Sequence, residues 1–198
     1  MKKYILLNNS VPWNYSGTES VSLIPTTDVV DRILIELRDA TDAVSATPST
    51  MVDTKACFLL KDGSVVSTGG NSKPEFNNLT VQHSHFVVIW HRNHLGIMSS
   101  VGLPHTGSIY SWDFSTAVTL IYNESAGYKE IATGVFGMPG SDGDADGNIN
   151  LNDKNLWAGD AGKNRYTPSD FDLNSQVGNQ DKNDVYVPNT AYNLQVPR

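Results

Sequence analysis

The chain has 198 residues, 39% of them hydrophobic and 18% charged, and a formal net charge of −7. This length accommodates one large domain, or a domain with a small appendage. The acidic balance argues against a nucleic-acid partner, because phosphate binding needs a basic face. The longest apolar stretch is 86–90, whereas a membrane-spanning helix needs roughly 20 residues, so no span is predicted. One cysteine, Cys57, excludes an internal disulfide framework and a cysteine-rich zinc site.

The first two thirds of the sequence predict a mainly β fold. The apolar runs 56–60 and 65–66 are joined through Asp62-Gly63, a dipeptide typical of β-hairpins. Loops rich in Gly, Pro, Ser and Asn recur about every 8 to 15 residues, which is typical of a β-sandwich. Further strands are expected at Tyr4–Leu7, Val21–Ile24, Phe86–His91, Leu95–Ser100, Ile109–Phe114 and Val118–Tyr122.

The segment 28–40 fits two patterns. Val29, Val30, Ile33, Leu34 and Leu37 follow a helical stripe, whereas Ile33, Ile35 and Leu37 also alternate as in a strand. Because β-branched residues dominate and the surroundings are β, we expect a short turn followed by a strand at 32–38.

The composition changes after the glycine-rich stretch 134–140. Residues 136–198 contain nine Asp and no Glu, against five Lys and Arg. We therefore predict a β-sandwich domain over 1–136 and a separate domain over 137–198. Aspartates concentrated in this way suggest that the second domain binds cations.

Residues 142–153 match the twelve-residue calcium loop of EF-hands at almost every position. Gly147 at position 6 permits the sharp turn, and Ile149 at position 8 is the apolar anchor that would pair with a partner loop. A short helix is expected to begin at position 12 and continue through 157. The predicted ligands are Asp142, Asp144, Asp146, the backbone carbonyl of Asn148, and Asp153.

A second copy, 170–181, lies 28 residues later. It is weaker, because Ser175 replaces the glycine at position 6 and Asn174 lowers the charge at position 5. Aspartate at position 12 reaches less easily than glutamate for bidentate ligation, so we expect affinities outside the tight buffer class. The predicted ligands are Asp170, Asp172, Asn174, Gln176 and Asp181, which gives two calcium ions per chain.

These loops, with Asp at position 12 and a short helix after each, resemble type I dockerin repeats. Over roughly 20–198 the chain resembles a C-terminal module of large secreted proteins of Bacteroidetes. Besides both loops, the stretches that carry the resemblance are 30–40, 56–66, 87–100, 128–131 and 194–197.

The dockerin resemblance implies calcium in both loops and docking to a cohesin-type β-sandwich partner. Dockerins typically present small polar pairs at loop positions 10 and 11. Here these positions hold Leu151-Asn152 and Asn179-Gln180. Packing of the tail on its own β domain is therefore the alternative.

Five histidines lie close together in the sequence: His83, His85, His91, His94 and His105. His83 and His85 would share one face of a strand, which is compatible with a zinc or copper site. No carboxylate follows at metal-ligand spacing, so we interpret the cluster as structural. A metal-dependent enzyme remains the alternative that this cluster would support. Cys57 lies in an apolar strand and is expected to be an inert buried thiol.

The aromatic residues offer a third function. Trp13 and Tyr15 lie in a polar loop and could stack on a sugar, as in a carbohydrate-binding module, whereas Trp90 and Trp112 lie in apolar strands and are expected in the core. No nucleophile elbow or phosphate-binding loop occurs, so no enzyme activity is expected.

Together these features predict a non-catalytic, calcium-stabilised structural or adhesion module of a secreted or cell-surface bacterial protein. Its partner would be a protein or a polysaccharide at the cell surface.

Overall fold

A computed structural model describes residues 15–17, 19 and 21–198 of the chain. The predicted strand Tyr4–Leu7 and the candidate ligand-binding residue Trp13 lie outside this part. Within it, no helix is long and apolar enough to cross a membrane.

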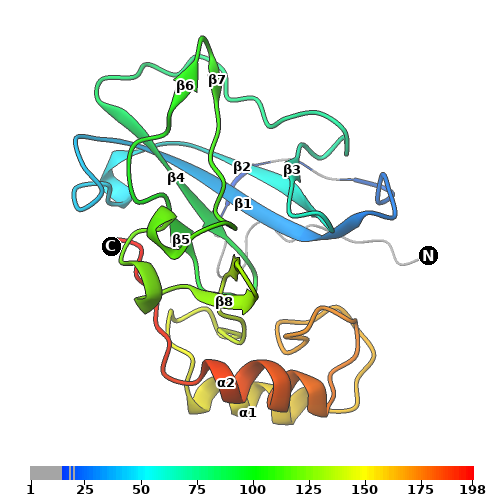
Figure 1. Ribbon diagram of the computed structural model, residues 1–198. Coiled ribbons are helices and arrows are strands. Elements are labelled where there is room, and N and C mark those ends of the chain that lie inside the picture. The colour runs from blue at the N-terminus through cyan, green and yellow to red at the C-terminus, as the bar shows by residue number, and fades with distance from the viewer. Residues whose placement is uncertain (1–14, 18, 20) are drawn as a thin grey trace.

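The core of the fold is a five-stranded antiparallel sheet in the order β3-β2-β1-β4-β5, drawn in blue to green in Figure 1. The central strand is paired along most of its length with its neighbour on either side. The strands are β1 (Val29–Ala40), β2 (Met51–Leu60), β3 (Val65–Val66), β4 (Ser84–Trp90) and β5 (Ile97–Met98).

β1 resolves the ambiguous segment in favour of a strand, longer at both ends than expected. Its residues 31–38 are all buried, because both faces of the sheet are covered. Ile33 and Leu37 enter the larger apolar cluster on one face. On the other face, Arg38 pairs with Glu36 at 2.6 Å. The helical stripe in the sequence therefore arises from a strand with apolar residues on both faces.

The predicted hairpin at Asp62-Gly63 is confirmed. The backbone N–H of Leu60 donates to the carbonyl of Ser64 at 2.9 Å, and Gly63 takes a positive φ of 84°, which glycine adopts without steric penalty. This turn joins β2 to the short edge strand β3.

Two other strand predictions are wrong. Residues 21–24 form no strand, and Val118–Leu120 is a 3₁₀ helix, η2. The buried Ile121 forms only an isolated bridge with Ser99. The apolar run therefore anchors a turn in the core and does not form a strand of the sheet. The strand expected at 109–114 is shortened to β7 (Ile109–Tyr110).

The larger cluster of the sheet is covered by irregular segments and small ribbons. Ile121, Tyr128 and Phe136 pack against it. The ribbons are formed by β6 (His105–Thr106) with β7 and by β8 (Lys129–Ala132) with β9 (Val135–Gly137); two further 3₁₀ helices are η1 (Pro48–Thr50) and η3 (Glu124–Ala126). The described residues thus contain one large sheet and two two-stranded ribbons, and the expectation of a mainly β chain is confirmed.

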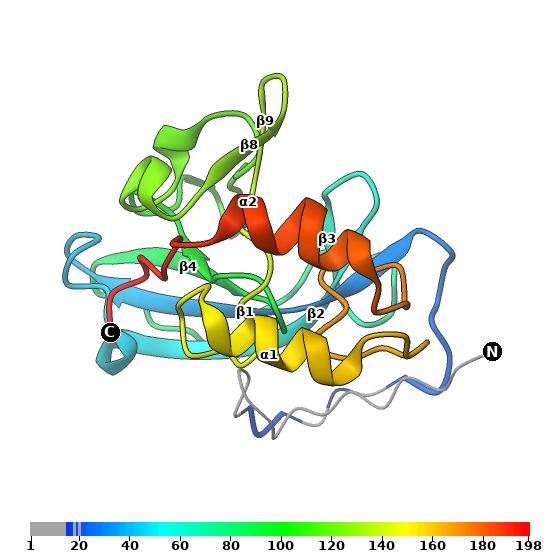
Figure 2. The ribbon, with the colours of Figure 1, turned by 90° about the horizontal axis from the view of Figure 1, so that it is seen from below.

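A small helical region at the C-terminus is also confirmed. It consists of α1 (Leu151–Asp160), the π-helix η4 (Asp181–Tyr186) and α2 (Val187–Asn189). The helices lie side by side on one side of the sheet, below it in Figure 1 (Figures 1 and 2). β9 ends at Gly137, before any of these helices, and the division into 1–136 and 137–198 stays a prediction.

After α2, the chain returns to the sheet. Val196, which is 4% exposed, packs with Phe86, Val88 and Met98 in the smaller apolar cluster of the sheet. The carbonyl of Pro197 accepts a hydrogen bond of 2.9 Å from the buried Arg38. Figure 2 shows this end of the chain lying beside β4 and the β1–β2 connection. The last residues therefore belong to the core of the sheet.

Val196→Ala should consequently lower the free energy of unfolding by about 2 kcal/mol, because it removes two methyl groups from a filled core. The matched control is Val101→Ala at a side chain that is 55% exposed, where a change below about 0.5 kcal/mol is expected. Denaturant unfolding measures both. Equal, small effects would show that the C-terminus does not stabilise the sheet.

Candidate metal centres

Two groups of three acidic side chains in the tail are close enough to hold one metal ion each. In each group, the candidate carboxylate oxygens lie within 4.8 Å of one another. The groups are Asp142, Asp144 and Asp146, and Asp170, Asp172 and Asp181. Oxygen donors of this kind suit a hard divalent cation such as Ca²⁺.

In the first loop, the carboxylate of Asp153 accepts hydrogen bonds from backbone groups near both ends of the loop. Its Oδ1 accepts from the backbone N–H of Gly143 at 2.8 Å and of Asp144 at 3.3 Å. Its Oδ2 accepts from the N–H of Asn150 at 2.8 Å, which forms a capping box at the start of α1. One fully buried side chain thus bonds to the loop backbone and caps the start of the helix.

The second loop repeats this network 28 residues later. Oδ1 of Asp181 accepts from the N–H groups of Phe171 at 2.6 Å and Asp172 at 3.0 Å. Its Oδ2 accepts from the N–H of Gly178 at 2.7 Å. Asp181 is also fully buried, and it is the first residue of η4, whereas Asp153 is the third residue of α1, which begins two residues earlier than expected.

The interior turns of the two loops correspond as well. Asp142 accepts from Gly147 N–H at 3.3 Å, and Asp170 accepts from Ser175 N–H at 3.2 Å. The turns between alternate positions follow the same scheme. They run from Asp146 N–H to Asp144, from Asn148 N–H to Asp146, from Asn174 N–H to Asp172 and from Gln176 N–H to Asn174.

Backbone conformation repeats at the same offset. Ala145 and Leu173 have φ of 58° and 64°, and Gly147 and Ser175 have φ of 86° and 69°. Glycine adopts this region freely, whereas serine does so only with strain. Ser175 therefore accepts an unfavourable conformation so that the second loop keeps the path of the first.

Burial and crowding make the charged form of the site carboxylates unfavourable without a cation. Burial raises the pKa of Asp142 to about 7, and the neighbouring charges of Asp153, Asp146 and Asp144 add to the effect. Burial likewise raises the pKa of Asp170 to about 6 against the opposing charge of Arg92. A bound divalent cation would relieve this repulsion.

The structure thus brings together six of the predicted ligands. Asp153 lies outside the first group, whereas Asp181, which accepts the corresponding backbone N–H bonds, belongs to the second. Asn174 lies in the second loop and accepts from Gln176. The roles of the Asn148 and Gln176 carbonyls stay predictions.

The expected pairing of the loops through position 8 is wrong. Ile149 exchanges backbone hydrogen bonds with Ala191 and Tyr192, and Val177 exchanges them with Gly162 and Lys163. Ile149 and Val177 are both buried, but each is hydrogen-bonded to a different segment of the tail and not to the other loop. The chain that follows each helix has taken the place of the partner loop.

Sequence reasoning missed the segment that joins both loops to the sheet, residues 91–95, here called the docking segment. The carbonyl of Asn93 accepts from Ser141 N–H at 2.8 Å and Asp142 N–H at 3.1 Å, at the start of the first loop. Its side-chain amide donates to the carbonyls of Pro168 at 2.9 Å and Asp170 at 2.7 Å, at the start of the second. One buried asparagine therefore contacts both loops.

Arg92 makes the charged part of this junction. Its Nε donates to Asp31 of β1 at 3.1 Å, and its guanidinium donates to the carbonyl of Thr167 and lies 3.5 Å from the carboxylate of Asp170. The guanidinium stacks 4.0 Å above the ring of Tyr166, whose hydroxyl donates to Asp31 at 2.5 Å. Burial would raise the pKa of Asp31, but His91, Arg92 and Tyr166 outweigh it and hold that pKa low.

Leu95 completes the junction. It is fully buried and packs in one apolar cluster with Ile149, Phe171 and Tyr186 of the tail. The apolar core beneath the two acidic loops therefore includes a side chain from the sheet part of the chain. Its backbone N–H also donates to Pro139 at 2.9 Å.

The five histidines contact neighbouring side chains singly or in pairs. His91 lies 3.1 Å from Asp31 and His94 2.9 Å from Asn93, both within the docking segment. Burial, followed by the nearby charges of His91 and Arg92, lowers the pKa of His94.

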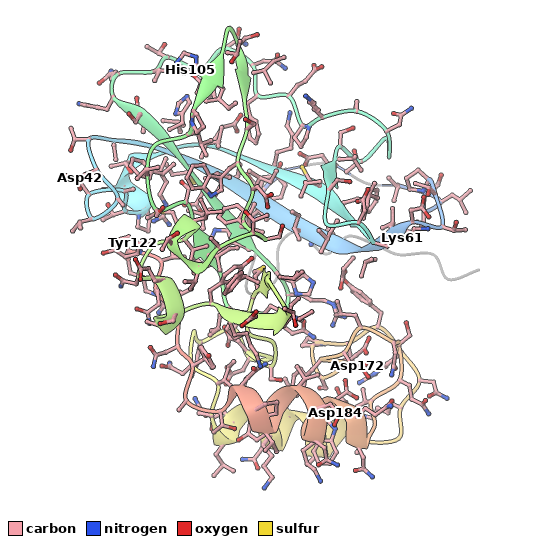
Figure 3. All side chains as sticks on the ribbon, in the orientation of Figure 1. Asp42, Lys61, His105, Tyr122, Asp172 and Asp184 are labelled. Atoms are coloured by element: carbon pink, nitrogen blue, oxygen red, sulfur yellow. The ribbon has the colours of Figure 1, made fainter. Side chains whose placement is uncertain are left out.

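The remaining histidines lie farther along β4 and on the β6–β7 ribbon. His83 lies 3.7 Å from Asp39, and His85 and His105 flank the ring of Tyr110. Figure 3 shows His105 at the opposite end of the molecule from Asp172. In the part of the chain that the structure describes, no candidate metal group includes a histidine.

Tyr15, the other candidate ligand-binding residue, lies beside β2. Its hydroxyl donates to Glu19 at 2.6 Å and contacts the carbonyl of Thr54 at 3.3 Å. Trp90 donates to Glu36 at 2.8 Å and Trp112 to the carbonyl of Leu120 at 3.1 Å, and both are partly buried. Cys57 is fully buried, and burial raises its pKa to about 12, as expected for an inert thiol.

Comparison with known protein families, curated proteins and solved structures found no match to this chain.

The side chain of Asn93 should contribute strongly to the stability of the chain. Asn93→Ala removes the side-chain amide, so that the carbonyls of Pro168 and Asp170 lose their donor and His94 loses its contact with Oδ1, whereas the backbone bonds from Ser141 and Asp142 are kept. We expect a loss of about 2 to 3 kcal/mol in the free energy of unfolding. The control is Asn71→Ala at an exposed loop position, with little change expected. Similar values for both variants would refute the role given to Asn93.

Proposed function

We propose that this chain is a non-catalytic structural or adhesion module stabilised by two calcium ions. The observation that carries the proposal is the repeated loop network. Two loops 28 residues apart share backbone path, hydrogen-bond scheme and clustered carboxylates. An acidic turn that arose by chance would not repeat all three features at one offset.

The chemistry of both loops supports an ion of the calcium type. The donors are carboxylate and carbonyl oxygens, which calcium binds in sets of six to eight. Such sites with moderate affinity would be filled at extracellular calcium levels and would act structurally. This is the reason for proposing that the module belongs to a secreted or cell-surface bacterial protein.

The proposed architecture has two parts. Residues 1–136 would form a β-sandwich-type platform and residues 137–198 a dockerin-like calcium-binding part, as in the C-terminal module of Bacteroidetes that the sequence resembles. The docking segment supports a tail that packs on its own platform, because Asn93 and Leu95 are buried against it. A cohesin-type partner for the tail remains the alternative function.

The partner of the module is proposed to be a protein or a polysaccharide at the cell surface. A carbohydrate-binding role for Trp13 and Tyr15 is the second alternative. In its described surroundings the Tyr15 hydroxyl already has partners in Glu19 and Thr54. A glycan array probed with the intact chain and with Tyr15→Ala tests this role.

Calcium binding is tested by isothermal titration of the chelator-treated chain with calcium chloride. We expect about two ions per chain, and Asp172→Asn should weaken one of the two sites about tenfold or more, because it removes one charged donor. Asp184→Asn is the matched control, since it removes a carboxylate from the same tail (Figure 3) at an exposed position outside both groups.

Absence of calcium binding in the unaltered chain would overturn the proposal. An equal effect of the Asp172→Asn and Asp184→Asn substitutions would also contradict it, because it would show that binding follows the net charge of the tail rather than the loops.

A further inference from the structure

The two loops differ in one buried contact. Asp170, at position 1 of the second loop, is fully buried, and a guanidinium nitrogen of Arg92 lies 3.5 Å from its carboxylate. Arg92 is itself only 6% exposed. Solvent screening of this pair is therefore weak, and the arginine counts as part of the electrostatic surroundings of the loop.

The first loop has no such partner. Within residues 15–17, 19 and 21–198, no Lys, Arg or His side chain is ion-paired with Asp142, Asp144, Asp146 or Asp153. The exposed Arg198 reaches the first loop, but it donates to the backbone carbonyl of Asp146 at 3.1 Å rather than to a carboxylate.

The charge balance of the loops differs accordingly. The first loop gathers four carboxylates, at positions 1, 3, 5 and 12. The second gathers three, at positions 1, 3 and 12, and Arg92 faces the one at position 1. Arg92 shares its charge with Asp31, and its other N–H groups donate to the carbonyls of Thr167 and Asp170. Arg92 therefore faces the charge of Asp170 and also hydrogen-bonds to the backbone at the start of the second loop.

We propose that Arg92 is a built-in counter-cation of the second loop, so that this loop stays formed and docked on the sheet without calcium, whereas the first loop needs the ion to remain ordered. This inference rests on the proposed calcium-binding function and concerns how the two sites divide it. Asn93 contacts both loops, whereas Arg92 is ion-paired with the second loop alone among the described residues.

Hydrogen exchange followed by mass spectrometry on the intact chain tests the proposal. The probes are peptides covering 141–150 and 169–178, compared in calcium chloride and in chelator. In chelator, the first peptide should exchange about tenfold faster or more, because its amides are held by mutually repelling carboxylates. The second peptide should change much less.

Arg92→Gln should make the second loop behave like the first, with protection in 169–178 lost in chelator and restored by calcium. Arg198→Gln, at the exposed arginine of the first loop, is the control and should leave 169–178 unchanged. The unaltered chain tests the proposal even if Arg92→Gln fails to fold, because the difference between the two loops is measured there first.

Equal loss of protection in both peptides of the unaltered chain would overturn the proposal, as would an Arg92→Gln variant whose second loop keeps its protection in chelator. A chain that binds no calcium in the titration, and whose exchange is the same in calcium and chelator, would instead refute the proposed function itself.

Discussion

The arrangement of the whole molecule depends on the contact between the docking segment and the two loops. The segment follows β4 directly, so its position is fixed by the sheet. Asn93 then satisfies backbone groups at the start of each loop, and Arg92 joins Asp31 on β1 to Asp170 in the tail. Buried polar groups of this kind are costly when unpaired and specific when paired. The tail therefore has one well-defined place on the sheet.

Both loops hold mutually repelling carboxylates together by the same arrangement of hydrogen bonds. Each loop brings carboxylates together by directing its backbone N–H groups at them, and the aspartate at position 12 accepts three of these bonds. Hydrogen bonds of this kind favour the charged form, but burial still raises the pKa of Asp142 and Asp170. We propose that a cation completes the balance in the first loop and infer that Arg92 supplies part of it in the second.

The sequence predicted what depends on local spacing. The two clusters of carboxylates, the turn at Gly147, a helix at the end of each loop and the hairpin at Asp62-Gly63 all follow from residues a few positions apart. It could not predict contacts between distant segments, such as Arg92 with Asp170 or Val196 in the core of the sheet. The anchor Ile149 is buried, but the prediction of its partner was wrong, because its backbone groups bond to Ala191 and Tyr192 after α2 and not to the second loop. Likewise, residues 118–120 of the run at 118–122 form a 3₁₀ helix, so the run pairs with the end of β5 only around the bridge between Ser99 and Ile121.

The most direct test of this account is differential scanning calorimetry of the intact chain in calcium and in chelator. Because the tail shares its core with the sheet through Leu95 and Val196, the account predicts that the transition that unfolds the sheet itself moves to higher temperature with calcium. Two separate transitions, of which only a small one responds to calcium, would show that the loops fold independently and would contradict the account.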